Sequence, residues 1–163
     1  MTKVGILTIS DKGSAGQRED GSGALLHELV KKLPGEVTYY KIIPDEREVI
    51  RDHLILLSDR QGVDLVLTTG GTGVSPRDVT PEATSEVLDR LIPGMGEVMR
   101  VEGYRQNPRA IISRGIAGIR GRTLIVNFPG STRGVRENFE VLLPALPHAL
   151  EKIRGDEGDC AKP

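Results

Sequence analysis

The sequence LVLTTGGTG at residues 65–73 is the clearest indication of the fold. Its first three residues form a short, wholly apolar run that is typical of a buried strand, and a glycine-rich segment follows at once. Thr-Pro-Glu at 80–82 then supplies a helix cap, a first-turn proline and an early acidic residue, which predicts a helix to about residue 90. Strand, glycine loop and helix in this order indicate one unit of an α/β protein.

The same alternation extends toward both ends of the chain. Apolar or β-rich runs predict further strands at 4–9, 37–43 and 124–127. Apolar residues at helical spacing predict helices at 22–33, 45–58, 95–105 and 135–150, the last one broken or kinked by its prolines. Short apolar strands between helices imply a mainly parallel sheet covered on both faces, a three-layer α/β/α sandwich.

The length and composition fit a single domain. We expect it at residues 1–155 of the 163, followed by a polar and flexible tail at 156–163. Cys160, the one cysteine, allows no intrachain disulfide and indicates a reducing compartment. Because no secretion signal and no apolar run of about 20 residues occurs, a cytoplasmic location without membrane attachment is expected.

The charge and the aromatic content argue against general binding to polyanions. The 22 basic and 23 acidic residues give a formal charge of -1. Three Tyr, two Phe and no Trp leave little surface for stacking on bases. Neither nucleic acid nor an anionic membrane is therefore expected as a partner.

Three loops are candidates for the functional site because each follows a predicted strand. They span residues 10–23, 70–78 and 129–134. In an open parallel sheet, ligands bind beyond the carboxyl ends of the strands. If the three strands are neighbours, their loops converge on one crevice.

The middle loop carries groups suited to a phosphate. Its three glycines let backbone amides approach an anion closely, and Thr72 adds a hydroxyl donor. Arg77 and Asp78 add a cation and a carboxylate that suits Mg2+. The alternative is a glycine-rich turn that only reverses the chain.

Two familiar nucleotide motifs are absent. Gly16 and Gly21 have the spacing of a P-loop, but Ser22 occupies the lysine position. Pro76 stands where the dinucleotide-binding fingerprint needs a small residue. The glycine loop must therefore work differently.

Longer motifs resemble a known family. The central motif joins TTGGTG at 68–73 to PRDVTPEAT at 76–84, and shorter matches are ISD at 9–11, PDE at 44–46, SRGIAGIRG at 113–121, NFPG at 127–130 and LLPAL at 142–146. Together they resemble the molybdopterin adenylyltransferases, the MogA/MoaB family that includes the G domain of gephyrin. The resemblance extends from Val4 to about Gly155. One difference is Ser131-Thr132, where many members have Asn-Pro.

The resemblance implies a homotrimer that transfers AMP from ATP to the phosphate of molybdopterin and releases pyrophosphate. It also implies hand-over of the product to the molybdenum-inserting enzyme. Asp45 and Asp78 match the two family carboxylates tied to catalysis and to the metal, here Mg2+. The positions expected to bind substrate or nucleotide are Ser10, Asp11, Asp20, Ser22, Gly70, Gly71, Thr72, Gly73, Arg77, Ser113, Arg114, Gly130 and Ser131.

Each of these assignments has a structural alternative. Asp45 fits the start of a capping box, and Asp78 fits a residue that stabilises a turn. The polar residues of the 10–23 loop suit ordinary turn chemistry, and Ser22 suits the cap of the next helix. Arg114 fits a surface ion pair as well as a bidentate contact with phosphate.

Two other functions remain open. A molybdopterin-binding trimeric scaffold without catalysis would keep the pocket, but it would need neither Asp45 nor Asp78 as a metal ligand. An unrelated nucleotide-binding regulator is disfavoured by the length of the family match.

Overall fold

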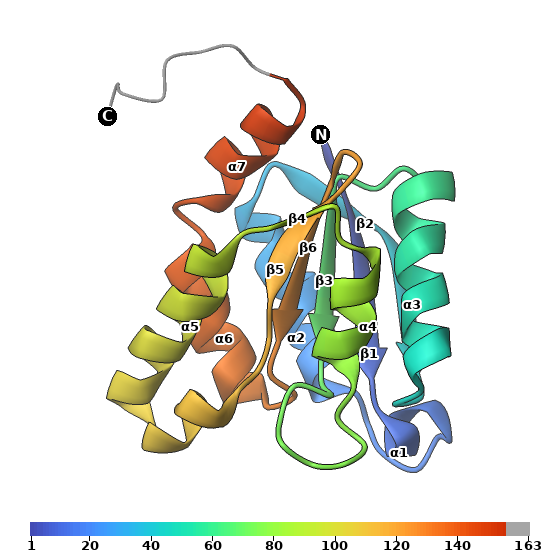
Figure 1. Cartoon of the computed structure of the whole chain (residues 1–163), viewed down its shortest axis with the longest axis vertical. Helices are drawn as coiled ribbons and strands as arrows, with labels where there is room; N and C mark the ends of the chain where they lie inside the picture. Colours follow the sequence, from blue (N-terminus) through green and yellow to red (C-terminus); the bar gives the residue numbers. More distant parts are fainter. Residues whose placement is uncertain (156–163) are drawn as a thin grey trace.

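The computed structural model, which describes residues 1–155, forms a six-stranded sheet with helices on both faces (Figure 1). Its strands are β1 (Thr2–Ile9), β2 (Gly35–Ile43), β3 (Leu65–Thr69), β4 (Arg90–Leu91), β5 (Ala117–Arg120) and β6 (Thr123–Phe128). Their order across the sheet is β2-β1-β3-β6-β5-β4. The first four in this order run parallel, whereas β5 pairs antiparallel with β6, and β4 pairs antiparallel with β5. The mainly parallel sheet is confirmed, and its antiparallel edge was not expected.

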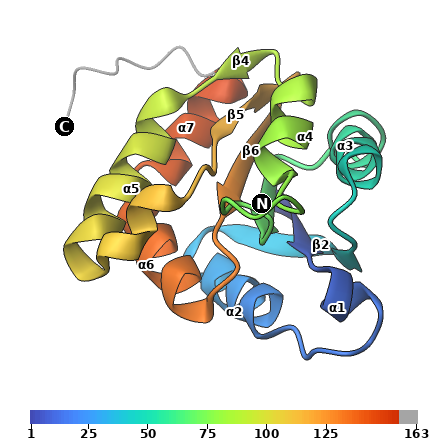
Figure 2. The same ribbon diagram turned by 60° about the horizontal axis from the view of Figure 1, so that its bottom comes forward.

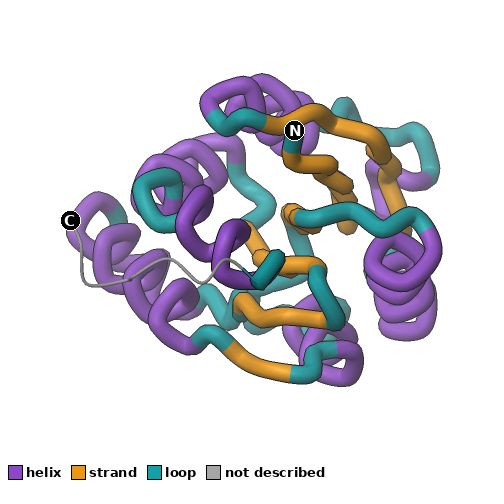
Figure 3. The backbone as a smooth tube through the Cα atoms, turned by 90° about the horizontal axis from the view of Figure 1, so that it is seen from above, coloured by secondary structure: helices purple, strands orange, loops and turns teal. Residues whose placement is uncertain are grey.

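Helices connect the strands and lie on both faces of the sheet. They are α1 (Asp11–Ser14), α2 (Gly21–Leu29), α3 (Arg47–Ile55), α4 (Thr80–Val87), α5 (Pro93–Gln106), α6 (Thr132–Leu142) and α7 (Leu146–Ile153). Three short turns of other helical types are η1 (Val30–Lys32), η2 (Leu56–Arg60) and η3 (Pro108–Ile112). In Figure 2, α2, α5, α6 and α7 cover one face of the sheet, and α3 and α4 cover the other. Figure 3, seen from above, shows helices on both sides of the strands.

Successive residues of a strand point to opposite faces of the sheet, so an apolar core forms on each face. The two cores hold the three layers together. In β3, Leu65 and Leu67 pack in a core with side chains of α2, α5, α6 and α7. Val66, between them, packs with Ile50 and Leu54 of α3 in the second core. Each of these side chains is fully buried, which stabilises the fold by about 1.5–3 kcal/mol apiece. The three-layer α/β/α sandwich is confirmed.

Two helix starts differ from the expectation. Asp20, not Ser22, caps α2, because its carboxylate accepts a 2.8 Å hydrogen bond from the amide of Gly23. Asp45 does not cap α3, which begins at Arg47 without a side-chain cap. The carboxylate of Asp45 instead accepts a hydrogen bond from a residue of the loop that follows β1. The Asp45 carboxylate thus makes a hydrogen bond to a distant loop in place of the expected cap of its own helix.

The last helical segment is broken, as its prolines predicted. α6 ends at Leu142, α7 begins at Leu146, and Pro144 lies between them. Within residues 1–155 no helix has both the length and the apolar character that crossing a membrane would need. The expected tail and Cys160 lie outside the described residues.

Candidate active site

The three candidate loops meet at one end of the sheet. They follow β1, β3 and β6, which are adjacent and parallel, so their carboxyl ends lie side by side. A cleft with two lobes opens there. One lobe, of about 640 Å³, lies at the start of α2 and is called the α2 lobe; the other, of about 410 Å³, lies beside α5 and is called the α5 lobe. The convergence expected from the sequence is therefore observed.

Four residues line both lobes and form a saddle between them: Gly71, Asp78, Gly130 and Ser131. The α2 lobe also contains Asp45, so both predicted metal-binding carboxylates reach the same cleft. The predicted residues that line the α2 lobe are Ser10, Asp20, Ser22, Asp45, Gly70, Gly71, Asp78, Gly130 and Ser131. Thr72, Gly73 and Ser113 line the α5 lobe.

The glycine loop is shaped by close backbone contacts that admit no side chain. Gly70 and Gly71 have φ angles of 100° and 65°, which favour glycine. A Cβ on Gly70 would lie 2.2 Å from the carbonyl oxygen of Ile9, and one on Gly71 would lie 2.2 Å from Oγ1 of Thr80. Thr80 fixes the loop further, because its hydroxyl donates to the carbonyl of Gly70 at 2.9 Å.

Backbone donors of this loop are available to an anion. Within residues 1–155, the amides of Gly71, Thr72 and Gly73 donate to no acceptor. Unpaired amides in a glycine-rich loop form a concave site for a phosphate. The arrangement favours an anion site over the plain turn that the sequence left open.

Asp45 and Asp78 lie against the two ends of the same glycine loop. Oδ1 of Asp45 is 3.1 Å from the Cβ position of Gly71, and Oδ2 of Asp78 is 2.8 Å from that of Gly73. Each carboxylate uses one oxygen to hold a loop: Asp45 accepts from the amide of Asp11, and Asp78 accepts from that of Ser75, both at 2.9 Å. The other oxygen of each has no donor among the described residues.

The environment of Asp45 disfavours its charged form. Partial burial raises the pKa of its carboxyl, and the negative charges of Asp11 and Asp78 raise it further, against the amide hydrogen bond and the cation of Arg77. Bringing a cation to this position would relieve that repulsion. In the part of the chain that is described, no three His, Cys, Asp or Glu residues form a metal site on their own. A metal here would need oxygens from a substrate, as Mg2+ commonly does.

Arg77 and Asp11 form an ion pair with each other and do not line the cleft. The guanidinium of Arg77 donates to Asp11 from Nε at 3.1 Å and from Nη2 at 2.9 Å, and Nη2 also reaches Glu46 at 2.9 Å. These bonds lower the pKa of Asp11 and raise that of Arg77. Neither residue lines a lobe, so the structure does not place them as the predicted substrate ligands; they tie together the loops after β1, β2 and β3.

Arg114 also lies outside both lobes, and the ion-pair alternative describes it correctly. Its guanidinium pairs with Glu82 of α4. It also donates to the carbonyls of Gly73, at 2.7 Å, and Asp78, at 2.8 Å. Arg114 therefore braces the glycine loop against α4 and holds Asp78 in place.

Asp20 reaches the α2 lobe, but its oxygens are already occupied. One oxygen accepts from the amide of Gly23 and the hydroxyl of Ser22, and the other from the hydroxyls of Thr8 and Tyr40. Burial acts to raise its pKa, yet these four hydrogen bonds outweigh burial and lower it. Burial and the carboxylate of Asp20 raise the pKa of Tyr40 to about 12. Asp20 thus orders the wall of the lobe.

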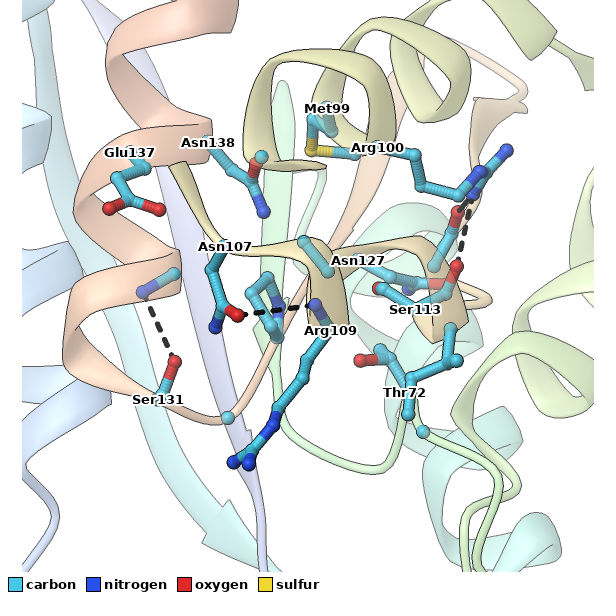
Figure 4. A pocket seen from close by; sticks show the side chains of 18 of the residues that line it. Thr72, Met99, Arg100, Asn107, Arg109, Ser113, Asn127, Ser131, Glu137 and Asn138 are labelled. Carbon is cyan, nitrogen blue, oxygen red and sulfur yellow. Dashed lines mark hydrogen bonds between the residues drawn. The ribbon is translucent and has the colours of Figure 1, made fainter. Parts of the chain in front are cut away.

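The α5 lobe contains residues that were not among the predicted site residues (Figure 4). Arg109 comes from η3, Arg133 and Glu137 from α6, and Asn127 from the end of β6. Asn127 is the one with a sequence signal, since it is an amide at the end of an apolar strand. Its side chain is 1% exposed and donates to Thr68 Oγ1 and Thr84 Oγ1, at 3.0 Å each. Nothing in the sequence indicated η3, which brings Arg109 to the lobe.

Comparisons with known proteins identify the family of this chain. The model of a family described as "Probable molybdopterin binding domain" matches residues 5–148. A molybdopterin adenylyltransferase of Helicobacter pylori is 44% identical over 156 residues, which cover 94% of this chain and 88% of the relative. Gephyrin of Dictyostelium discoideum is 44% identical over 160 residues, covering 92% of this chain and 22% of gephyrin.

The fold also matches that of solved structures. A crystal structure of the molybdopterin biosynthesis enzyme MoaB from Thermus thermophilus superposes with a TM-score of 0.91 at 53% identity, covering 96% of this chain and 98% of that one. The family predicted from the sequence motifs is confirmed. Because the family model spans most of its length and its relatives match nearly end to end, the chain belongs to the molybdopterin-binding domain family.

Proposed function

We propose that this protein is a molybdopterin adenylyltransferase of molybdenum cofactor biosynthesis, which transfers AMP from ATP to the phosphate of molybdopterin. The observation that carries the proposal is the saddle: two lobes, each large enough for part of a substrate, meet at a loop with unpaired amides and two carboxylates. The relative of Helicobacter pylori with this name matches nearly end to end, which supports the same activity here.

The chemistry requires two anions to approach each other. An oxygen of the molybdopterin phosphate attacks the α-phosphorus of ATP, and the bond from that phosphorus to the bridging oxygen of pyrophosphate breaks. The nucleophile is already ionised near neutral pH, so positioning and charge neutralisation are the main tasks of the protein. The unpaired amides of Gly71, Thr72 and Gly73, whose loop lines the cleft, support a role in holding phosphate oxygens there.

Asp45 and Asp78 fit the binding of Mg2+. Each lies beside the glycine loop and keeps one carboxylate oxygen without a donor among the described residues, and Mg2+ is commonly held by one or two carboxylates together with substrate phosphates. When bound, Mg2+ would neutralise charge on the phosphates. The α2 lobe is lined by four carboxylates and one arginine, a balance that favours a metal-bound polyphosphate over a bare one.

The test is an assay with purified protein, molybdopterin, ATP and Mg2+ that follows AMP incorporation and pyrophosphate release. Asp45→Asn and Asp78→Asn should bind the pterin but lose turnover by at least about a hundredfold. Asp52→Asn, an exposed carboxylate of α3, is the matched control and should retain turnover. Wild-type turnover in Asp45→Asn or Asp78→Asn would remove that carboxylate from the metal site.

A molybdopterin-binding scaffold without catalysis is the second candidate. It is favoured if the wild-type protein and Asp78→Ala both bind the pterin and both fail to transfer AMP. The free oxygens of Asp45 and Asp78 count against it, since a carrier has no use for paired carboxylates beside a phosphate site.

We further propose that the protein is a homotrimer. Apolar side chains stand exposed on one stretch of chain, α5 and the following η3; they are Val98, Val101, Tyr104, Ile111 and Ile112. Contact between copies would remove this surface from water. Sedimentation equilibrium at the mass of three chains is the expected result, and a monomer at all concentrations would refute it.

A further inference from the structure

Arg109 is an uncommitted cation in the α5 lobe. The amide of Arg109 donates to Oδ1 of Asn107 at 3.1 Å, which fixes the start of η3. The side chain projects into the lobe and, in the view of Figure 4, its guanidinium lies between Ser131 and Thr72. Among residues 1–155 no carboxylate or carbonyl accepts from this guanidinium.

The other arginines of the lobe are already occupied. Arg100 donates to the carbonyl of Gly115 at 2.9 Å and shapes the wall of the lobe. Arg133 donates to Glu137 at 2.6 Å, an ion pair within α6. Three arginines and two carboxylates line this lobe, whereas the α2 lobe is dominated by carboxylates. The α5 lobe therefore suits an anionic group that brings no metal of its own.

The saddle supplies further donors within the same lobe. Ser131 and the glycine loop line the α5 lobe together with Arg109. A guanidinium presents a planar fork of donors that matches two oxygens of one phosphate, and unpaired amides complete the set. A carboxylate partner would cancel this charge, and Arg109 has none among the described residues.

We propose that Arg109 binds a phosphate group of the substrate that occupies the α5 lobe, and so selects phosphorylated ligands there. The inference rests on the proposed function, in which two phosphorylated substrates meet at the saddle. The shared chemistry is a phosphate oxygen, and its source is either ATP or molybdopterin. Arg109 thus adds a substrate-binding residue from an element that no sequence motif marked.

Calorimetric binding of four ligands tests this proposal: Mg-ATP, adenosine, molybdopterin and dephosphorylated molybdopterin. Arg109→Gln should weaken binding of one or both phosphorylated ligands about tenfold, a modest loss because the side chain is exposed, and should leave the dephosphorylated counterpart unaffected. The ligand that is weakened identifies the occupant of the lobe. Arg109→Lys should restore part of the loss, since it keeps the charge without the planar fork.

Arg136→Gln is the matched control, because Arg136 is an exposed arginine of α6 that lines neither lobe. Wild-type affinity of Arg109→Gln for both phosphorylated ligands would overturn the proposal, and so would an equal loss for the dephosphorylated ligands. The readout is binding rather than turnover. If the wild-type protein transferred no AMP while Arg109→Gln still lost phosphate affinity, the proposed activity would fail and this inference would stand.

Discussion

Substituting Gly71 with alanine should damage the saddle more than its size suggests. At a φ of 65° an alanine is strained by about 1–2 kcal/mol. Its Cβ would also lie 2.2 Å from Oγ1 of Thr80, which is fully buried. Moving Thr80 breaks its hydrogen bond to the carbonyl of Gly70, which costs about 1–3 kcal/mol when the acceptor stays buried. The expected loss is therefore about 2–5 kcal/mol of unfolding free energy.

Thermal and urea unfolding measure this loss directly. A fall of about 2–5 kcal/mol corresponds to roughly 4–20 °C in Tm for a domain of this size. Gly16→Ala is the matched control: its φ is 71°, but no atom lies within 4 Å of the added Cβ, so it should show the strain alone. In a Thr80→Ala background the 2.2 Å clash is absent, so the cost of Gly71→Ala should fall toward that of Gly16→Ala, with only the contact of 3.1 Å to Oδ1 of Asp45 and that of 3.3 Å to the Cβ of residue 80 remaining. Equal costs for both glycines in the wild-type background, or strict additivity with Thr80→Ala, would refute the reasoning.

Three further predictions concern the carboxylates around the cleft. In Gly73→Ala the new Cβ would lie 2.8 Å from Oδ2 of Asp78, so AMP transfer should fall by about a hundredfold with little change in Tm; lost stability with normal turnover would contradict this. Tyr40→Phe removes a hydrogen-bond donor to Asp20, so the lowered pKa of the Asp20 carboxyl should rise. That carboxyl stabilises the fold above its unfolded-state pKa, and this stabilisation is lost as the pH falls through its folded-state pKa. Acid unfolding, followed by circular dichroism, should therefore begin at a higher pH in the variant; an unchanged midpoint would exclude a role of Tyr40 in stabilising the Asp20 carboxylate. Burial and neighbouring negative charges raise the pKa of Asp45, and only the ionised carboxylate binds a metal. As the pH is lowered, the Mg2+ concentration for half-maximal activity should therefore begin to rise at a higher pH than it would with an ordinary carboxyl. A Mg2+ requirement that stays constant through that pH range would count against Asp45 as a ligand.

The central sheet could be predicted because its strands are short, apolar and separated by clear helix signals. The run at 65–67 and that at 124–127 became β3 and β6, and Pro144 separated α6 from α7 as expected. β4 and β5 were missed because β4 has two residues, β5 has four, and their antiparallel pairing depends on tertiary contacts. Local capping rules failed at Asp45 for the same reason, since its hydrogen-bond partner lies 34 residues away.

The site could be predicted in part. The loop positions followed from strand order, and the motif supplied Asp45 and Asp78. The sequence could not reveal which cations already have partners: Arg77 pairs with Asp11, 66 residues earlier, and Arg114 pairs with Glu82. Arg109 was missed because the turn that carries it has no apolar periodicity or motif of its own.

Locating the metal tests directly whether Asp45 and Asp78 bind it. Crystals grown with Mn2+ in place of Mg2+ and a non-hydrolysable ATP analogue would give an anomalous signal at the ion. We expect one peak at the saddle, within roughly 2–2.5 Å of a carboxylate oxygen of both Asp45 and Asp78 and in contact with the phosphates. A fully occupied ion that touches neither carboxylate would contradict the account.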